Sequence, residues 1–167
     1  MNALKLIDEG NSTIGNVSDL ISKSTFFNGF ESSEVKILAN WFIAYSLTTG
    51  TFILKEGNEE NCLCIIIEGD IDIYKETEPN KHLKVAVVTA NETIGEMGVI
   101  DGEPFSASAI ASSDSIILTI TREDFERLIA QDEKLGVKLL RKIAAIISFR
   151  LRRTTGRLAD LLANSPD

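Results

Sequence analysis

The chain of 167 residues has few of the residue types that build metal centres and cross-links: two cysteines, Cys62 and Cys64, and one histidine, His82. The two cysteines are two positions apart on an expected strand, so their side chains project to the same face. Such neighbours rarely reach the geometry of a disulfide bond, and a metal site would need more ligands than these residues supply. We therefore expect two buried, reduced thiols, with redox sensing as the alternative.

The sequence also lacks a long apolar run. The run from Cys62 to Ile67 is six residues long, whereas about 20 are needed to span a bilayer. The first residues, MNALKLIDEG, lack the apolar segment and cleavage site of a secretory signal. We therefore expect a cytoplasmic protein with no membrane segment. A hydrophobic fraction of 44% and a charged fraction of 25% suit one soluble globular domain with a hydrophobic core.

Charge is distributed unevenly along the chain. Residues 1–133 hold nine Lys and Arg against 23 Asp and Glu, a net charge of −14, whereas residues 134–167 hold eight against two, a net charge of +6. Such asymmetry can indicate a tail that binds nucleic acid. Here the basic residues belong to one amphipathic helix beside an acidic body that they would neutralise, so we expect no direct DNA binding.

Hydrophobic periodicity changes twice along the chain. Residues 1–16 are polar and mixed, which predicts a frayed arm or a short helix. From Val17 to Tyr45, apolar residues recur at helical intervals and predict two or three short helices, with Ser32 or Ser33 as an N-cap. Residues 48–121 instead contain short β-rich runs about ten residues apart, which predicts an antiparallel sandwich or barrel of about eight strands.

Turn residues separate these runs, among them Gly57-Asn58, Gly69-Asp70 and Pro79-Asn80. From Arg122 onward the chain is expected to be helical, with Thr121 as the N-cap of the first helix.

The last predicted helix, from about residue 134 to residue 163, contains no proline and would be roughly 45 Å long. Alternating spacings of four and three residues mark a seam typical of a two-stranded coiled coil, formed by Leu140, Ala144, Ile147, Leu151, Thr154, Leu158 and Leu161. A second stripe, Leu139, Ile143 and Ile146, would pack on the chain's own barrel. A helix with two apolar faces needs two partners, so the pattern predicts a homodimer through this helix rather than a helix buried in one domain.

The run from Ile94 to Ala109, IGEMGVIDGEPFSASA, resembles the phosphate-binding cassette of cyclic-nucleotide-binding domains, whose pattern is FGELALxxxxPRAATV. The residues that fall at the spacings of this pattern are Gly95, Glu96, Gly98, Gly102, Pro104, Ala107 and Ser108. Where the family carries an arginine that grips the cyclic phosphate, this chain has Phe105. Nearly the whole chain is similar to the sensor half of the bacterial cyclic-AMP receptor protein family.

This resemblance implies an eight-stranded double-sheet jelly roll over residues 17–133, an N-terminal arm (1–16) and a C-terminal dimerisation helix (134–167). It assigns the nucleotide pocket to Gly95, Glu96, Met97, Phe105, Ser106, Ala107, Ser108, Arg150, Thr154 and Thr155. In family members a helix-turn-helix domain follows, whereas this chain stops at Asp167. We therefore expect a sensor module without its own DNA-reading domain.

Each pocket residue has an implied role. Glu96 would accept a hydrogen bond from the ribose hydroxyl, and Gly95 would let the backbone approach the ribose. Backbone amides at Ser106 and Ala107 would donate to the phosphate. Thr154 and Thr155 occupy the positions that contact the base, one from each subunit.

Phe105 removes one partner of a desolvated charge pair, which typically costs about 2–5 kcal/mol, so binding of cyclic AMP or cyclic GMP is expected to be weakened. The ring is also expected to occupy the space of the phosphate. Arg150, Arg153 or Arg152 could compensate by reaching inward.

The sequence thus favours a non-enzymatic, dimeric regulatory module. It would signal to a downstream partner through motion of its terminal helix, biased by a ligand or a partner. One alternative is a different ligand, neutral or apolar, beside Phe105. Another is a pure protein-interaction module with a filled pocket. Enzymes of the cupin type share the architecture but need several metal ligands, which a single histidine does not supply. No enzymatic activity, metal or cofactor is therefore expected.

Overall fold

The computed structural model describes residues 5–6, 16–78 and 81–164. The chain forms two compact units, Met1–Arg127 (unit 1) and Leu128–Asp167 (unit 2). In its described residues, unit 1 contains nine strands: β1 (Lys5–Leu6), β2 (Ile43–Leu47), β3 (Phe52–Leu54), β4 (Cys62–Glu68), β5 (Ile71–Glu78), β6 (Lys81–Val88), β7 (Thr93–Ile94), β8 (Ser108–Ala111) and β9 (Ser115–Thr121). The turn expected at Pro79-Asn80 lies outside the described residues.

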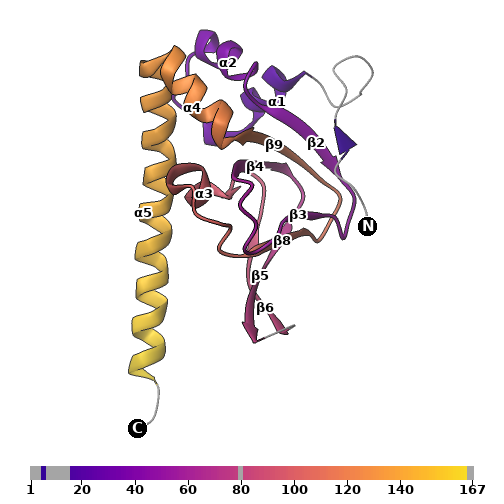
Figure 1. Ribbon diagram of the computed structural model, residues 1–167, viewed down its shortest axis with the longest axis vertical. Coiled ribbons are helices and arrows are strands. Elements are labelled where there is room, and N and C mark those ends of the chain that lie inside the picture. Colours follow the sequence, from indigo (N-terminus) through magenta and orange to yellow (C-terminus); the bar gives the residue numbers. More distant parts are fainter. Residues whose placement is uncertain (1–4, 7–15, 79–80, 165–167) are drawn as a thin grey trace. The chain divides into compact units, whose positions relative to one another are not determined.

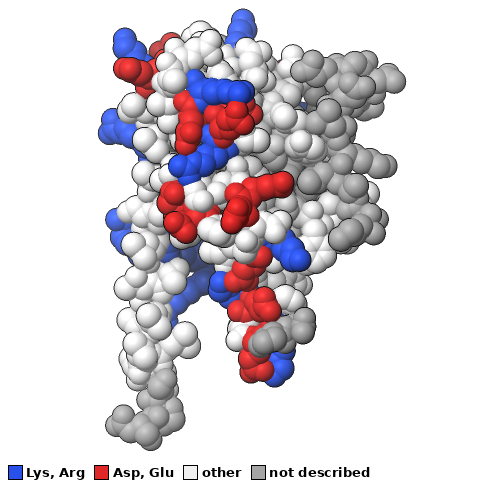
Figure 2. Space-filling view, in the orientation of Figure 1, with Lys and Arg blue, Asp and Glu red and all other residues white. Residues whose placement is uncertain are grey.

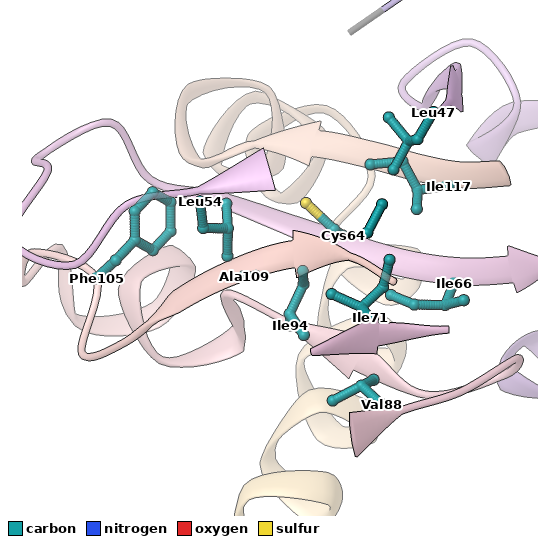
Figure 3. Close-up of a cluster of buried hydrophobic side chains, with 11 residues drawn as sticks. Leu47, Leu54, Cys64, Ile66, Ile71, Val88, Ile94, Phe105, Ala109 and Ile117 are labelled. Atoms are coloured by element: carbon teal, nitrogen blue, oxygen red, sulfur yellow. The ribbon is translucent and has the colours of Figure 1, made fainter. Parts of the chain in front are cut away.

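The strands form two antiparallel sheets, one in the order β1-β2-β9-β4-β7 and one in the order β3-β8-β5-β6 (Figure 1). Side chains from both sheets meet in one buried cluster, which we call the inter-sheet core: Leu47, Leu54, Cys64, Ile66, Ile71, Val88, Ile94, Phe105, Ala109, Ala111 and Ile117 (Figure 3). Strand β4 lies between β9 and β7 and is buried from Leu63 to Ile67. The predicted double-sheet jelly roll is confirmed.

Three short helical segments precede the roll, as the sequence predicts: α1 (Val17–Lys23), the 3₁₀ turn η1 (Thr25–Phe27) and α2 (Ser32–Leu38). Phe27 of η1 packs edge to face against Phe42, the residue before β2, and the centres of the two rings are 5.6 Å apart. Two expectations are wrong here. The N-cap of α2 is Glu31, whose carboxylate accepts a hydrogen bond from the backbone N–H of Glu34. The carboxylate of Glu34 in turn accepts from the backbone N–H of Glu31. Residues 43–45 are not helical, because they belong to β2, which pairs with β9.

The N-terminal arm is described only at Lys5–Leu6, which pairs with β2 as an edge strand instead of a helix. The remainder of the arm, residues 1–4 and 7–15, lies outside the described residues.

Strands β5 and β6 extend beyond the rest of their sheet as a two-stranded ribbon (Figure 1). Strand β5 pairs with β8 only from Ile71 to Tyr74, but it pairs with β6 as far as Glu78. Among the described residues, no second strand therefore pairs with β5 beyond Tyr74, and Leu83 on β6 is 57% exposed.

Helix α4 (Arg122–Gln131) begins at the end of unit 1, and α5 (Glu133–Ala163) forms most of unit 2. Thr121 caps α4 as predicted, since its Oγ1 accepts from the backbone N–H of Asp124 at 3.1 Å. In α5 the second stripe contains the fully buried Leu139 and Ile143. From Leu151 onward every residue of α5 is exposed.

Candidate ligand-binding site

The cassette is built around a single short helix, α3 (Glu96–Asp101). Gly95 and Gly102 bound this helix, each with φ of 77°. A positive φ of this size strains any residue with a Cβ, so glycine suits both ends of α3. The chain then runs from Glu103 to Ala107 and enters β8.

Two glycines let α3 lie directly against the start of β4. A Cβ on Gly95 would collide with the carbonyl oxygen of Cys62, and a Cβ on Gly98 would collide with the side chain of Asn61. The backbone of the cassette is therefore in direct contact with Asn61 and Cys62. Glu96 is buried within this arrangement, whereas Met97 is 51% exposed.

Phe105 is buried in the inter-sheet core and lies beside Leu54 at one end of it (Figure 3). Both polar groups of its backbone form hydrogen bonds. Its N–H donates to the carbonyl of Asn58 at 3.0 Å, and its carbonyl accepts from the N–H of Gly57 at 2.9 Å. The position that carries a cation in the resemblance therefore contributes apolar packing here.

The three residues after Phe105 differ in exposure. Ser106 is exposed, Ala107 is half-buried and Ser108 is buried. The Oγ of Ser108 accepts from the backbone N–H of Glu56 at 3.0 Å. The cassette is thereby tied to the end of β3 as well as to β4.

Lys75 of β5 brings a positive charge to the cassette, because its Nζ donates to the carbonyl of Ser106 at 2.7 Å. The same ammonium group forms an ion pair with Glu56. The hydrogen bond from Lys75 holds the pKa of Glu56 below its ordinary value, with help from the backbone N–H of Glu76. Glu56 is therefore charged near neutral pH and neutralises Lys75.

A pocket of about 590 Å³ opens in unit 1 beside the cassette. Its inner wall is largely apolar and includes Tyr45, Ile53, Leu54, Phe105 and Ile117. Its outer wall carries the charged residues Lys55, Glu59, Glu60, Arg122, Glu123 and Glu126. Around α3 the charged side chains are mainly acidic, whereas over α4 acidic and basic side chains are mixed (Figure 2). Such a pocket suits a ligand that is not an anion.

Both cysteines also line this pocket. They are free, and Cys64 is buried as expected, whereas Cys62 is half-buried. Their Sγ atoms are 3.7 Å apart. The described part of the chain contains no cluster of three or more His, Cys, Asp or Glu side chains that could hold a metal ion.

The remaining predicted pocket residues belong to α5 in unit 2. Arg150 is half-buried, and Thr154 and Thr155 are exposed. The Oγ1 of Thr155 donates to the carbonyl of Leu151 at 2.9 Å, within the helix itself. The approach of these three side chains to the cassette stays a prediction.

Residues 45–132 match the profile of the family described as "Cyclic nucleotide-binding domain". The chain belongs to this family. The match begins in β2 and ends after α4, so it contains the roll, the cassette and Phe105.

Two relatives of the chain are described as a cAMP-activated regulator and as a cyclic AMP receptor. It is 25% identical over 146 residues to the CRP-like cAMP-activated global transcriptional regulator of Mycobacterium tuberculosis, covering 87% of this chain and 63% of that protein. It is 28% identical over 140 residues to the Cyclic AMP receptor protein of Thermus thermophilus, covering 84% of this chain and 62% of that protein. The chain thus spans less than two thirds of either regulator.

A solved cyclic nucleotide-binding domain from Methylobacillus flagellatus has the same architecture. It superposes with a TM-score of 0.79 at 28% identity, covering 98% of this chain and 91% of that one. In the described residues of the present chain, no helix combines the length and apolar character needed to cross a membrane.

Family membership does not by itself locate every site residue. Sequence reasoning found the cassette and the substitution at Phe105, but it did not find the pocket walls at Tyr45 and Ile53 or the contact from Lys75. These residues come from β2, β3 and β5, and no local motif joins them. The available signal was the pair of cysteines on one face of β4.

Proposed function

We propose that this chain is a non-enzymatic regulatory module that binds a small ligand in its roll and signals through α5, with weakened affinity for cyclic AMP and cyclic GMP. The observation that carries the proposal is Phe105, a buried ring at the cassette position where family members place the phosphate-binding cation. The names of the relatives support a sensor role, because two of them are described as cAMP-activated or as a cyclic AMP receptor.

Three features support weakened binding of a cyclic phosphate. Phe105 supplies no charged donor, and the loss of such a partner costs about 2–5 kcal/mol, or roughly 30-fold to several thousand-fold in affinity. Lys75 contacts the cassette but is neutralised by Glu56. The pocket walls beside Phe105 carry four glutamates against one lysine and one arginine. The local field is therefore unfavourable for an anion.

The pocket itself favours a second candidate, binding of a neutral or apolar small molecule. Its volume of about 590 Å³ falls within the range of about 300–1,000 Å³ that is usual for ligand pockets. Phe105, Leu54 and Ile117 give it an apolar inner wall. In this case the cassette would serve as a scaffold beside the pocket.

Signalling through α5 rests on the exposure of its seam. Leu151 and Leu158 are 65% and 54% exposed, and they belong to the four-three spacing of a coiled coil. A second copy of the chain would cover them. We therefore propose a homodimer whose helices respond to ligand, with a downstream protein as the recipient.

The test of the cyclic-nucleotide proposal is calorimetric titration of cyclic AMP and cyclic GMP into wild type and Phe105→Arg. We expect wild-type dissociation constants of roughly tens of micromolar to millimolar and at least about tenfold tighter binding by Phe105→Arg. Phe105→Leu is the matched control, because it changes the core side chain without adding charge.

Denaturation of each variant with urea checks that the core tolerates the substitution. Wild type binding at low micromolar, with no gain in Phe105→Arg, would contradict the assigned effect of Phe105. Equal gains in Phe105→Arg and Phe105→Leu would show that space, not charge, limits binding.

A further inference from the structure

Cys62 and Cys64 form a pair of thiols on one face of β4. Their cross-strand neighbours on β9, Thr121 and Thr119, face the same side, and both cysteines line the pocket described above. The Sγ–Sγ distance of 3.7 Å is an ordinary van der Waals contact between two sulfurs. The two sulfurs are therefore already placed to coordinate a single central atom.

The surroundings of the pair select the kind of atom. In the described residues no third His, Cys, Asp or Glu joins it to make a metal cluster, so the four ligands of a structural zinc site are not present there. Thiolates favour soft centres. A linear two-coordinate ion would have to push the sulfurs apart, whereas a pyramidal three-coordinate centre joins sulfurs that are already neighbours.

A disulfide fits the pair less well than a bridging atom. Residues two apart on a strand have Cα atoms about 6.4–6.8 Å apart, at the upper end of the range that disulfides tolerate. Pairing of β4 with β9 on one side and β7 on the other holds the backbone at Cys64 in this extended form.

The pocket provides room for the third substituent of a pyramidal centre. Its apolar wall next to the cysteines includes Tyr45, Ile53 and Phe105, within a volume of about 590 Å³. The glutamates on its outer wall disfavour an anionic group. A neutral, apolar substituent, such as a small aryl ring, fits these walls.

We propose that Cys62 and Cys64 form a dithiol site for monosubstituted trivalent arsenicals, with the organic substituent lying in the apolar pocket. This site is distinct in chemistry from the cyclic-nucleotide cassette and does not depend on nucleotide binding. It nevertheless adjoins the cassette, because the carbonyl of Cys62 lies against Gly95.

The reaction is a substitution without oxidation or reduction. An organoarsenic(III) oxide, R–As=O, reacts with two thiols to give R–As(S–Cys)₂ and one water. Two As–S bonds form, the As–O bonds and two S–H bonds break, and both protons leave with the oxygen. Arsenic stays trivalent throughout, so no co-reactant is needed.

The two thiols differ in how readily they ionise. The hydrogen bond from Cys64 lowers the pKa of Cys62. The same hydrogen bond, burial and the nearby charges of Cys62 and Glu96 raise the pKa of Cys64. Cys62 is also half-buried, whereas Cys64 is buried, so Cys62 is the more accessible nucleophile and Cys64 follows once arsenic is attached to its neighbour.

Phenylarsine oxide is the probe for the full chain. We expect one arsenical per chain by intact-protein mass spectrometry, with loss of both titratable thiols and reversal by a small dithiol but not by a monothiol. Cys62→Ser and Cys64→Ser each leave one thiol, so we expect roughly 100-fold weaker binding, because the second sulfur acts at high effective concentration. Cys62 is only half-buried, so Cys62→Ser keeps the test informative if Cys64→Ser does not fold.

The organic substituent has its own control pair on β3. Ile53 lines the pocket, whereas its neighbour Phe52 is 58% exposed. We expect Ile53→Ala to weaken phenylarsine oxide binding and Phe52→Ala to leave it unchanged. Two arsenicals per chain, full reversal by a monothiol, or undiminished affinity in Cys62→Ser would overturn the proposal. These outcomes say nothing about cyclic AMP, so the two proposals fail separately.

Discussion

Gly95 is the residue at which the cassette touches the sheet. Its φ of 77° requires the left-handed region, and the space where a Cβ would stand is filled by the carbonyl oxygen of Cys62. Gly57 has a similar φ of 82°, but a Cβ at this position would have open space around it among the described residues. The two glycines therefore separate the cost of backbone strain from the cost of a collision.

We predict that Gly57→Ala lowers the free energy of unfolding by about 1 kcal/mol, the cost of placing a Cβ in the left-handed region. Gly95→Ala should cost about 1–3 kcal/mol more, because α3 must also move away from β4. Urea unfolding of both variants measures the difference. Equal costs would mean that the contact with Cys62 relaxes freely.

At the residue scale, the sequence was sufficient to find site residues that are close together along the chain. The spacing of Gly95, Glu96 and Pro104 identified the cassette, and the departure at Phe105 was visible by inspection. Lys75 was not found, because its contact with Ser106 spans 31 positions and depends on how β5 passes the cassette.

Among the elements, β2 shows why periodicity alone was misleading. Val35, Leu38 and Ile43 fit a helical repeat, yet the chain leaves the helix at Leu38 and enters a strand at Ile43. What decides the matter is pairing with β9, more than 70 residues away, as in Ile43 with Thr119. A five-residue strand is too short for its own alternation to outweigh the preceding pattern.

The ribbon of β5 and β6 contains a partly buried ion pair. Lys84 Nζ lies 2.7 Å from Asp72 Oδ2, and its hydrogen bond and charge, with hydrogen bonds from Ser112 and Tyr74, lower the pKa of Asp72. A lowered pKa gives stability that is present above the pKa of the unfolded carboxyl and is lost as the pH falls through the folded value.

We predict that Lys84→Met lowers the free energy of unfolding by about 0.5 kcal/mol at pH 7, since the lysine is half-exposed. The difference from wild type should shrink below about pH 4 as Asp72 becomes protonated. Lys81→Met is the control on the same strand, because its ion pair with Glu78 is mostly exposed. Urea unfolding between pH 3 and pH 7 measures the difference in the free energy of unfolding. A difference that does not change with pH would assign the effect to packing of the lysine stem.

At the scale of the whole molecule, the surface on which the proposed dimer depends is the C-terminal half of α5. The sequence predicted this helix and its seam, because long uninterrupted periodicity is the most reliable local signal. The approach of Arg150, Thr154 and Thr155 to the cassette stays a prediction, because it depends on the proposed assembly.

We predict that Leu151→Glu converts a dimer into monomers, because it places a charge in the seam. Ala159→Glu makes the same change of charge at an exposed position outside the seam and should leave the dimer intact. Sedimentation equilibrium of the two variants beside wild type measures both. A dimer that survives Leu151→Glu would move the interface to another surface.

The main-chain anchoring of Phe105 has an evolutionary consequence. Its amide and carbonyl fix the course of the loop whatever side chain they carry. During evolution the side chain at this position can therefore change while the course of the loop is kept. The cost of such a change lies in the packing of the inter-sheet core, where the ring of Phe105 is buried.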